Sequence, residues 1–260
     1  MPWLTLLPGS AAAVAAMMVA LWLTSLVKRD VSIVDPWWSI GCLVVAVRTA
    51  LASGLTPGRL LLLTLVTLWA LRLFCYLLWR GWGEPEDPRY QAFRERYGPE
   101  RYRWLSLFQV FMLQGVLILI VSAPLQVALT APTPDPIRWN DGLGLALFAL
   151  GFGFEVLGDW QLARFKSDPA NRGRVLDRGV WRLTRHPNYF GEATLWWGLW
   201  LCAVDAPGGI VSVFAPALMT FLLLRVSGVP MLEEQLKKTK PAYAEYIRRT
   251  SAFFPRPPRD

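Results

Sequence analysis

The sequence predicts an all-α, polytopic membrane protein with seven transmembrane helices, and three observations support this fold class. Of the 260 residues, 54% are hydrophobic and only 18% are charged, against the ~25% usual in soluble domains. Apolar runs long enough to cross a bilayer recur along the chain. Most basic residues lie in the connections between these runs, as they do in the cytoplasmic loops of membrane proteins.

Seven apolar segments define the predicted helices. Five have the ~17 to 25 residues that a hydrocarbon core of ~30 Å requires, at residues 11–27, 31–52, 60–79, 108–129 and 142–165. Two shorter segments follow at residues 189–204 and 209–224, joined by a very tight connection. No basic stretch precedes the first segment, and Lys28 and Arg29 follow it. We therefore expect a retained helix and not a cleaved signal peptide.

The distribution of Lys and Arg predicts the orientation. When the loops are placed alternately, 22 of the 27 basic residues fall on one side, and the other side receives only Arg59 and Arg138. The positive-inside rule then puts the amino terminus outside and the carboxyl terminus in the cytoplasm. We predict that the membrane is the inner membrane of a bacterium. Topology thus explains the net charge of +8, and we expect no nucleic-acid partner because no recognition motif is present.

Other classes of site find no support. Cys42, Cys75 and Cys202 all lie in apolar segments without CxxC spacing, so neither a disulfide framework nor a zinc site is predicted. No other metal-ligand set is apparent, and nothing indicates an obligate protein partner. Internal repeats are not visible, which weighs against a transporter built from paired halves.

The segment 142–165 carries charges at membrane depth, where ionisable groups are usually functional. Gly144, Gly151 and Gly158 recur every seven residues, Glu155 lies four after Gly151, and Asp159 lies four after Glu155. At 100° per residue all five share one helical face. Such a face permits the close approach of a neighbouring helix or of a ligand. The alternative is ordinary small-residue packing, with Asp159 paired to an arginine.

The single histidine, His186, lies in the motif RHPNYFGE, directly after a strongly basic segment. That segment can hold phosphate groups, and Asn188, Tyr189 and Glu192 add hydrogen-bonding groups. A cofactor site at a membrane face is one interpretation, and a loop that is basic only for topology is the other. The basic residues concerned are Arg164, Lys166, Arg172, Arg174, Arg178, Arg182 and Arg185.

A second group of polar residues lies in the first half. Arg72, Tyr76 and Arg80 repeat at four-residue spacing on one helical face and could line a cavity. Asp35, in IVDPWWS, could pair with Arg72 as a purely structural ion pair. The stretch GEPEDPRYQAFRERYGPERY reads as an amphipathic interfacial segment rather than a catalytic element.

These motifs together resemble a known family. A carboxylate-bearing helix, a basic loop, GVWRLTRHPNYFGE and a closing EEQLKKTKPAYAEYIRRTSAFFP are similar to the membrane reductases of the steroid 5α-reductase superfamily, and most closely to its bacterial branch. VDPWWS and RLFCYLLWRGWGEPEDPRY extend the similarity to most of the first half. Sterol reductases share a comparable RHxNYxG element, and isoprenylcysteine carboxyl methyltransferases share RHPxYxG with the EE and Tyr-rich tail. The motif is therefore typical of the superfamily and not of one reaction.

The resemblance implies an NADPH site. In the reductases, a polar residue followed four positions later by aspartate, together with the Asn and Glu of an NxxGE element, belongs to this site. They fall here on Glu155, Asp159, Asn188 and Glu192. One reductase arginine falls on Arg174, and a second is replaced by Lys166, which still supplies charge but no bidentate fork. The resemblance also places in this site Arg172, Arg185, His186, Tyr189, Glu234 and Arg249.

The early helices depart from the reductase pattern. The Gln-Glu pair that polarises the substrate ketone in steroid reductases is replaced by Val34 and Asp35, and the aligned aromatic is Trp69, with Tyr76 two turns on. We predict that protonated Asp35, with Tyr76, donates to the carbonyl, because an apolar site raises the pKa of a carboxyl group. The His and Tyr at the start of the reductase tail are also absent, with Val229, Glu233 and Glu234 in their place.

The predicted protein is a single membrane reductase domain over residues 1–260, whose second half, 142–260, carries the cofactor site. The resemblance implies that it uses NADPH to reduce the activated C=C bond of a lipid-soluble enone, a 3-oxo-Δ4-steroid or a related molecule, that enters from the bilayer. One alternative is an S-adenosylmethionine-dependent methyltransferase, although a cofactor without phosphates would not explain so much positive charge. The non-enzymatic alternative is a transporter or lipid-binding membrane protein.

Overall fold

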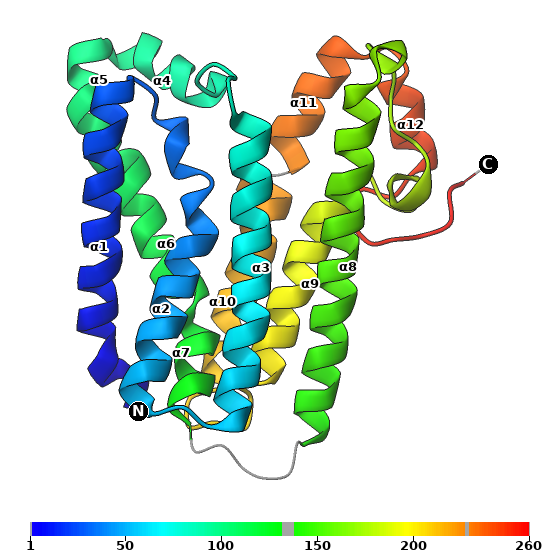
Figure 1. The fold of residues 1–260 in the computed structure, drawn as a ribbon. Coiled ribbons are helices and arrows are strands. Elements are labelled where there is room, and N and C mark those ends of the chain that lie inside the picture. Colours follow the sequence, from blue (N-terminus) through cyan, green and yellow to red (C-terminus); the bar gives the residue numbers. More distant parts are fainter. Residues whose placement is uncertain (1, 132–137, 227–228, 260) are drawn as a thin grey trace. The chain divides into compact units, whose positions relative to one another are not determined.

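The computed structural model describes residues 2–131, 138–226 and 229–259, and Figure 1 shows their arrangement. Helices make up 79% of the chain, and no strand occurs among the described residues. The all-α prediction is therefore confirmed. The chain forms two compact units, residues 1–135 with 205–212 and residues 136–204 with 213–260.

The first unit is built from long apolar helices and several shorter ones. Its elements are α1 (Pro2–Lys28), η1 (Ser32–Val34), α2 (Trp37–Ser53), α3 (Pro57–Gly81), α4 (Pro88–Tyr97), α5 (Pro99–Ser106), η2 (Leu107–Met112), α6 (Leu113–Val121) and α7 (Ala123–Thr130). Two arginines inside this unit donate hydrogen bonds to backbone carbonyls: Arg48 of α2 donates to that of Leu6 at 2.8 Å, and Arg59 of α3 donates to that of Ala131 at 2.8 Å. Each thereby ties the ends of neighbouring helices together.

The second unit holds most of the residues predicted to bind a cofactor. Its elements are α8 (Trp139–Ser167), η3 (Pro169–Asn171), η4 (Gly179–Arg182), α9 (Pro187–Leu201), α10 (Phe214–Phe221), η6 (Leu222–Val226), α11 (Val229–Thr239) and α12 (Tyr243–Arg249). The turn η5 (Val211–Val213) lies where the chain passes from one unit to the other.

Glycines bring α8 and α9 into close contact, and the two helices lie side by side in Figure 1. A Cβ atom added at Gly151 would lie 2.5 Å from the carbonyl oxygen of Gly191, and one added at Gly198 would lie 2.5 Å from that of Gly144. These distances are too short for any side chain, so the two backbones touch. The predicted close approach on the glycine face is confirmed, and the neighbour is α9.

Several helices are suited to a bilayer. Four stretches are long and apolar enough to cross one: α1, α3, Pro99–Val121 and α8, with shorter apolar helices at α2 and at Val211–Val226. On α8, exposed Trp139 and Trp160 stand roughly 31 Å apart at 1.5 Å per residue, close to the core thickness of ~30 Å. Tryptophans favour the two membrane interfaces. These features indicate an integral membrane protein, while seven spans and the orientation of the termini stay predictions.

The second predicted segment begins later than expected. Residues 31–36 are not part of α2, because η1 forms there and Pro36 has no N–H with which to continue a helix. Asp30 stabilises this turn by accepting a hydrogen bond from the backbone N–H of Ser32 at 2.8 Å. As a result, Asp35 lies in the connection between α1 and α2, outside both helices.

Candidate functional site

The carboxyl end of α8 and the amino end of α9 meet in a cluster of buried polar groups. Asp159 is 3% exposed, and its Oδ1 accepts a hydrogen bond from Asn188 Nδ2 at 3.2 Å. Glu155 lies one turn earlier on α8 and is 2% exposed. Glu192 is buried one turn further along α9, where its Oε1 accepts from Trp196 Nε1 at 3.0 Å. We call Glu155, Asp159, Asn188 and Glu192 the polar cluster.

His186 precedes α9 and is fully buried beside an ion pair. Glu233 Oε1 lies 3.1 Å from His186 Nε2 and 2.7 Å from Arg185 Nε, so one carboxylate oxygen serves both side chains. The imidazole ring also stacks on the ring of Tyr189, with ring centroids 5.4 Å apart and planes 2° from parallel. Arg185 also donates to the carbonyl of Thr250 at 2.5 Å. The start of α9 is thereby fixed to α11 and α12.

The pKa of Glu233 makes this anchor sensitive to acid. Burial alone would raise the pKa, but hydrogen bonds from His186 and Arg185 outweigh it and lower the pKa from 4.5 to about 2. A depressed carboxylate pKa contributes stability that is present above the unfolded value of 4.5 and is lost as the pH falls through about 2. We expect the free energy of unfolding to fall by roughly 3 kcal/mol from this group over that window. Thermal unfolding from pH 6 to pH 2 measures it.

A matched pair of variants isolates this contribution. Glu233→Gln should flatten the acid limb of the stability profile, because the glutamine cannot titrate. Glu234→Gln should leave the profile close to that of the native protein, since Glu234 is exposed and its ion pair with Lys238, four residues on, is screened by solvent. A Glu233→Gln profile that still falls like the native one would disprove the assignment.

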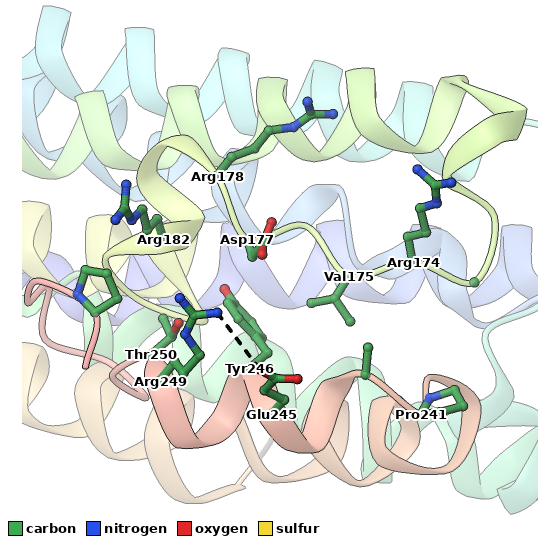
Figure 2. Close-up of a pocket in the computed structure, with 13 residues that line it drawn as sticks. Arg174, Val175, Asp177, Arg178, Arg182, Pro241, Glu245, Tyr246, Arg249 and Thr250 are labelled. Atoms are coloured by element: carbon green, nitrogen blue, oxygen red, sulfur yellow. Dashed lines mark ion pairs between the residues drawn. The ribbon is translucent and has the colours of Figure 1, made fainter. Parts of the chain in front are cut away.

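Beyond α8, the basic loop forms one side of a pocket (Figure 2). Lys166 and Arg172 lie exposed at its beginning, and Arg174 and Arg249 line the pocket from the loop and from α12 respectively. The backbone carbonyl of Arg174 accepts a hydrogen bond from Lys240 Nζ at 2.6 Å, which holds the loop against the connection between α11 and α12. Three arginines of the basic loop, Arg174, Arg178 and Arg182, thus line one pocket.

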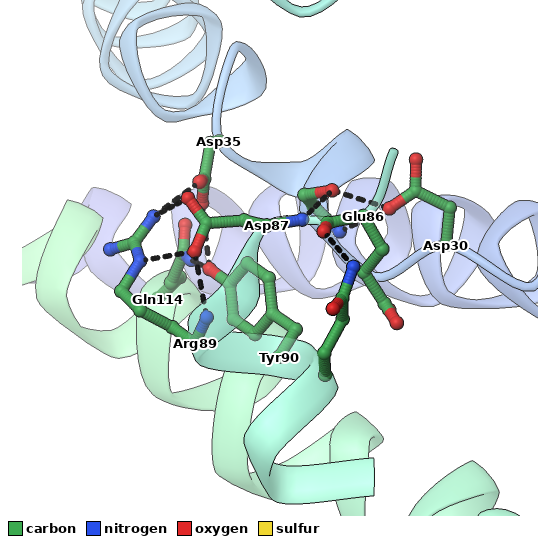
Figure 3. Close-up of polar contacts among 9 residues, drawn as sticks. Asp30, Asp35, Glu86, Asp87, Arg89, Tyr90 and Gln114 are labelled. Carbon is green, nitrogen blue, oxygen red and sulfur yellow. Dashed lines mark hydrogen bonds and ion pairs between the residues drawn. The ribbon is translucent and has the colours of Figure 1, made fainter. Parts of the chain in front are cut away.

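In the first unit, Asp35 is the centre of a separate network (Figure 3). Its Oδ1 accepts from the hydroxyl of Tyr90 at 2.7 Å, and its Oδ2 accepts from Arg89 at 2.9 Å. Asp87 binds the same guanidinium at 2.9 Å. Burial raises the pKa of Asp35 above its ordinary value, while Arg89 and Tyr90 oppose that shift. The carboxyl group is therefore held at the inner side of α4.

A second contact fastens α4 to the connection between α1 and α2. Glu86 accepts from the backbone N–H of Val31 at 2.8 Å and from Arg94 at 2.7 Å. Gln114 of α6 reaches the Tyr90 hydroxyl from the opposite side at 3.4 Å. Three elements distant in sequence thus converge around Asp35.

The comparisons with known proteins place the chain in a family. The family described as "Protein of unknown function (DUF1295)" matches residues 21–250. The chain belongs to this family. DUF1295 is part of the steroid 5-alpha-reductase-like superfamily, as the motifs in the sequence predicted.

Two curated relatives of this DUF1295 chain are informative. An uncharacterized protein of Schizosaccharomyces pombe is 24% identical over 260 residues, which covers 91% of this chain and 76% of the relative. The steroid 5-alpha-reductase DET2 of Arabidopsis thaliana is 31% identical over 114 residues, 42% of each chain. No solved structure matches.

The structure brings together some predicted site residues and separates others. The polar cluster, His186, Tyr189 and Arg185 lie around the start of α9. Arg174 and Arg249 line the pocket, and Lys166 and Arg172 are exposed near it. Glu234 points to solvent beside Lys238. Tyr76, paired with Asp35 in our prediction, contacts the guanidinium groups of Arg72 and Arg80 at 5.4 and 5.7 Å from its ring centre.

Several residues of these networks were not predicted, among them Arg89, Tyr90 and Glu233. Arg89 and Tyr90 lie in the stretch interpreted as merely interfacial, although they directly follow Asp87-Pro88, a helix-start signal that indicates an ordered segment. The guanidinium beside Asp35 is that of Arg89, not of the Arg72 considered from sequence. Glu233 was noted only as a departure from the reductase pattern, and no signal in the sequence distinguishes it from Glu234.

Proposed function

We propose that this protein is an NADPH-dependent reductase of the activated C=C bond of a lipid-soluble enone, such as a 3-oxo-Δ4-steroid or a related molecule. The observation that carries the proposal is the polar cluster, in which Asp159 and Asn188 are in contact beside buried Glu155. Those residues match the pattern of the reductase cofactor site, and they adjoin a basic loop. Membership of the superfamily and the similarity to a steroid 5-alpha-reductase support an oxidoreductase.

The residues present fit a nucleotide with a carboxamide and phosphates. Asp159 and Glu192 offer carboxylate oxygens that accept hydrogen bonds, and Asn188 offers both a donor and an acceptor. Arg174, with Lys166, would neutralise phosphate charge. When bound, NADPH supplies the hydride. The glycine contacts between α8 and α9 keep the polar cluster rigid, so that these groups are held in position before binding.

The chain must also supply a proton donor for the substrate carbonyl. We assign this role to Asp35, whose carboxyl group lies between Tyr90 and Arg89; burial raises its pKa above the ordinary value, while the Arg89 guanidinium opposes that shift. Tyr90, at 2.7 Å, orients the carboxyl group, a position that the sequence had led us to give to Tyr76. A carboxylic acid that donates to the substrate carbonyl would stabilise the developing oxyanion.

NADPH is expected to stabilise the purified protein, and S-adenosylmethionine is not. A ligand at 100 times its Kd adds about 2.7 kcal/mol to the free energy of unfolding. The thermal unfolding midpoint in detergent measures this for each cofactor. A shift with S-adenosylmethionine alone would assign the chain to the methyltransferases, and no shift with either would favour transport or lipid binding.

Two asparagines of the α8–α9 pair provide a test of the NADPH site and its matched control. Asn188→Ala should weaken NADPH binding about tenfold, since it removes a hydrogen-bonding group from the polar cluster. Asn140→Ala should leave NADPH affinity unchanged, because Asn140 bonds the carbonyl of Leu201 at 3.1 Å at the opposite end of α8 and α9. Equal affinities in the two variants would count against the proposed site.

A further inference from the structure

A pocket of about 650 Å³ lies between the basic loop and α12 in the second unit (Figure 2). This volume falls within the ~300 to 1,000 Å³ of small-molecule sites. Four arginines surround it, and aliphatic groups and a tyrosine ring form part of its wall. We call it the basic pocket, lined by Gly173, Arg174, Val175, Asp177, Arg178, Arg182, Pro241, Ala242, Glu245, Tyr246, Arg249, Thr250 and Pro258.

The charges of the basic pocket do not cancel. Its four arginines face only two acids, Asp177 and Glu245. Arg249 pairs with Glu245 at 4.0 Å, whereas the guanidinium groups of Arg174 and Arg182 form no ion pair with the described residues. Positive charge gathered in a concave site attracts anions, and planar guanidinium groups bind phosphate oxygens in pairs.

The basic pocket lies close to the membrane surface. Trp160 is 54% exposed on α8 and marks one interface, and Arg164 of the next turn stands 5.6 Å from its ring centre. Phe165 lies five residues after Trp160, roughly 7.5 Å further along the helix axis. The guanidinium of Arg178, which lines the pocket, lies 5.8 Å from the ring centre of Phe165. Arg178, and with it this side of the basic pocket, thus lies near the depth of lipid headgroups.

A wall of two aromatic residues separates the basic pocket from the polar cluster. Tyr246 lines the pocket, and its hydroxyl donates to the carbonyl of Trp181. The indole of Trp181 donates in turn to the carbonyl of Gly158 at 3.0 Å, next to Asp159. Both aromatic side chains are buried. A ligand can therefore occupy the basic pocket without contacting the polar cluster.

We propose that the basic pocket binds the phosphate headgroup of an anionic phospholipid. The arginines would hold the phosphate, while Val175, Pro241 and Ala242 would contact the glycerol region. Basic pockets at headgroup depth are where anionic lipids bind to membrane proteins. Arg174 and Arg249 also belong to the predicted NADPH contacts, so the test has to separate a lipid from a nucleotide.

The test titrates the full-length protein in neutral detergent with short-chain phosphatidylglycerol and with phosphatidylcholine of the same chain length. We expect the unfolding midpoint to rise at concentrations of phosphatidylglycerol at least about tenfold lower than those of phosphatidylcholine. Arg182→Gln, whose side chain has no ion pair to lose, should lower the affinity for phosphatidylglycerol about fivefold, and Arg178→Gln should do the same. If Arg178→Gln fails to fold because the contact with the Phe165 ring is lost, the lipid affinity of Arg182→Gln still tests the proposal.

The control removes the same charge outside the pocket. Arg248 lies beside Arg249 on α12, but it is exposed and does not line the pocket. The lipid affinity of Arg248→Gln should therefore be unchanged. Equal binding of the two lipids, or an equal loss in Arg248→Gln, would overturn the proposal in favour of non-specific adsorption. Displacement of phosphatidylglycerol by NADPH, with Arg182→Gln weakening both ligands alike, would overturn it in favour of the cofactor's phosphates.

Discussion

Asp35→Leu is expected to lower the turnover of an enone substrate by roughly 10²- to 10³-fold while leaving NADPH affinity intact, the usual effect of losing one oxyanion donor. That loss corresponds to ~3 to 4 kcal/mol of activation free energy. The effect on folding should be smaller. The side chains of Asp35 and Arg89 are 31% and 39% exposed, and ion pairs so accessible contribute about 1 kcal/mol or less. Steady-state kinetics and thermal unfolding of the same preparation separate the two effects.

Asp87→Leu is the matched control for this variant. Asp87 pairs with the same Arg89 at 2.9 Å and is 34% exposed, so its loss removes a similar charge without touching Asp35. Turnover should fall little. Equal losses in both variants would mean that the attachment of α4, and not the Asp35 carboxyl, supports activity. Recovery of turnover in Asp35→Leu with Arg89→Leu would remove Asp35 from the mechanism altogether.

The helices could be predicted because their signals are local. All seven apolar segments lie within helices for most of their length, since burial of apolar side chains and backbone hydrogen bonding act over consecutive residues. The seven-residue spacing of Gly144, Gly151 and Gly158 likewise predicted one face of α8 for close packing, and α9 packs on that face. Periodicity in one helix thus predicted a contact, although it did not identify the neighbour.

Partners in the two polar networks depend on tertiary structure and were not predictable. Arg89 meets Asp35 across 54 positions of sequence, because α4 folds back onto the connection between α1 and α2. Glu233 and Glu234 are adjacent and chemically identical. They differ by about 100° around α11, and only the docking of that helix decides which one meets His186. Roles that rest on such contacts need a structure.

Gly151→Leu is expected to destabilise the second unit by about 3 kcal/mol or more, the upper end of the range for overpacked cores. A Cβ at this position would lie 2.5 Å from the carbonyl oxygen of Gly191 and 2.5 Å from the backbone nitrogen of Leu195. Backbone atoms cannot rotate away as a flexible side chain can, so α8 and α9 would have to separate. Asp159 would then move away from Asn188, and NADPH binding should be lost with the stability. Thermal unfolding and NADPH titration measure both.

Gly153→Leu tests whether the contact, and not the loss of a glycine, is responsible. Gly153 lies on the same helix, and an added Cβ would meet no atom of the described chain within 4 Å. Leucine has the higher helix propensity, so this variant should be neutral or stabilised by up to ~1 kcal/mol, with NADPH binding unchanged. If the two leucine variants were equally stable, α8 and α9 would not be in backbone contact, and the polar cluster would lack the rigid support on which the proposed cofactor site depends.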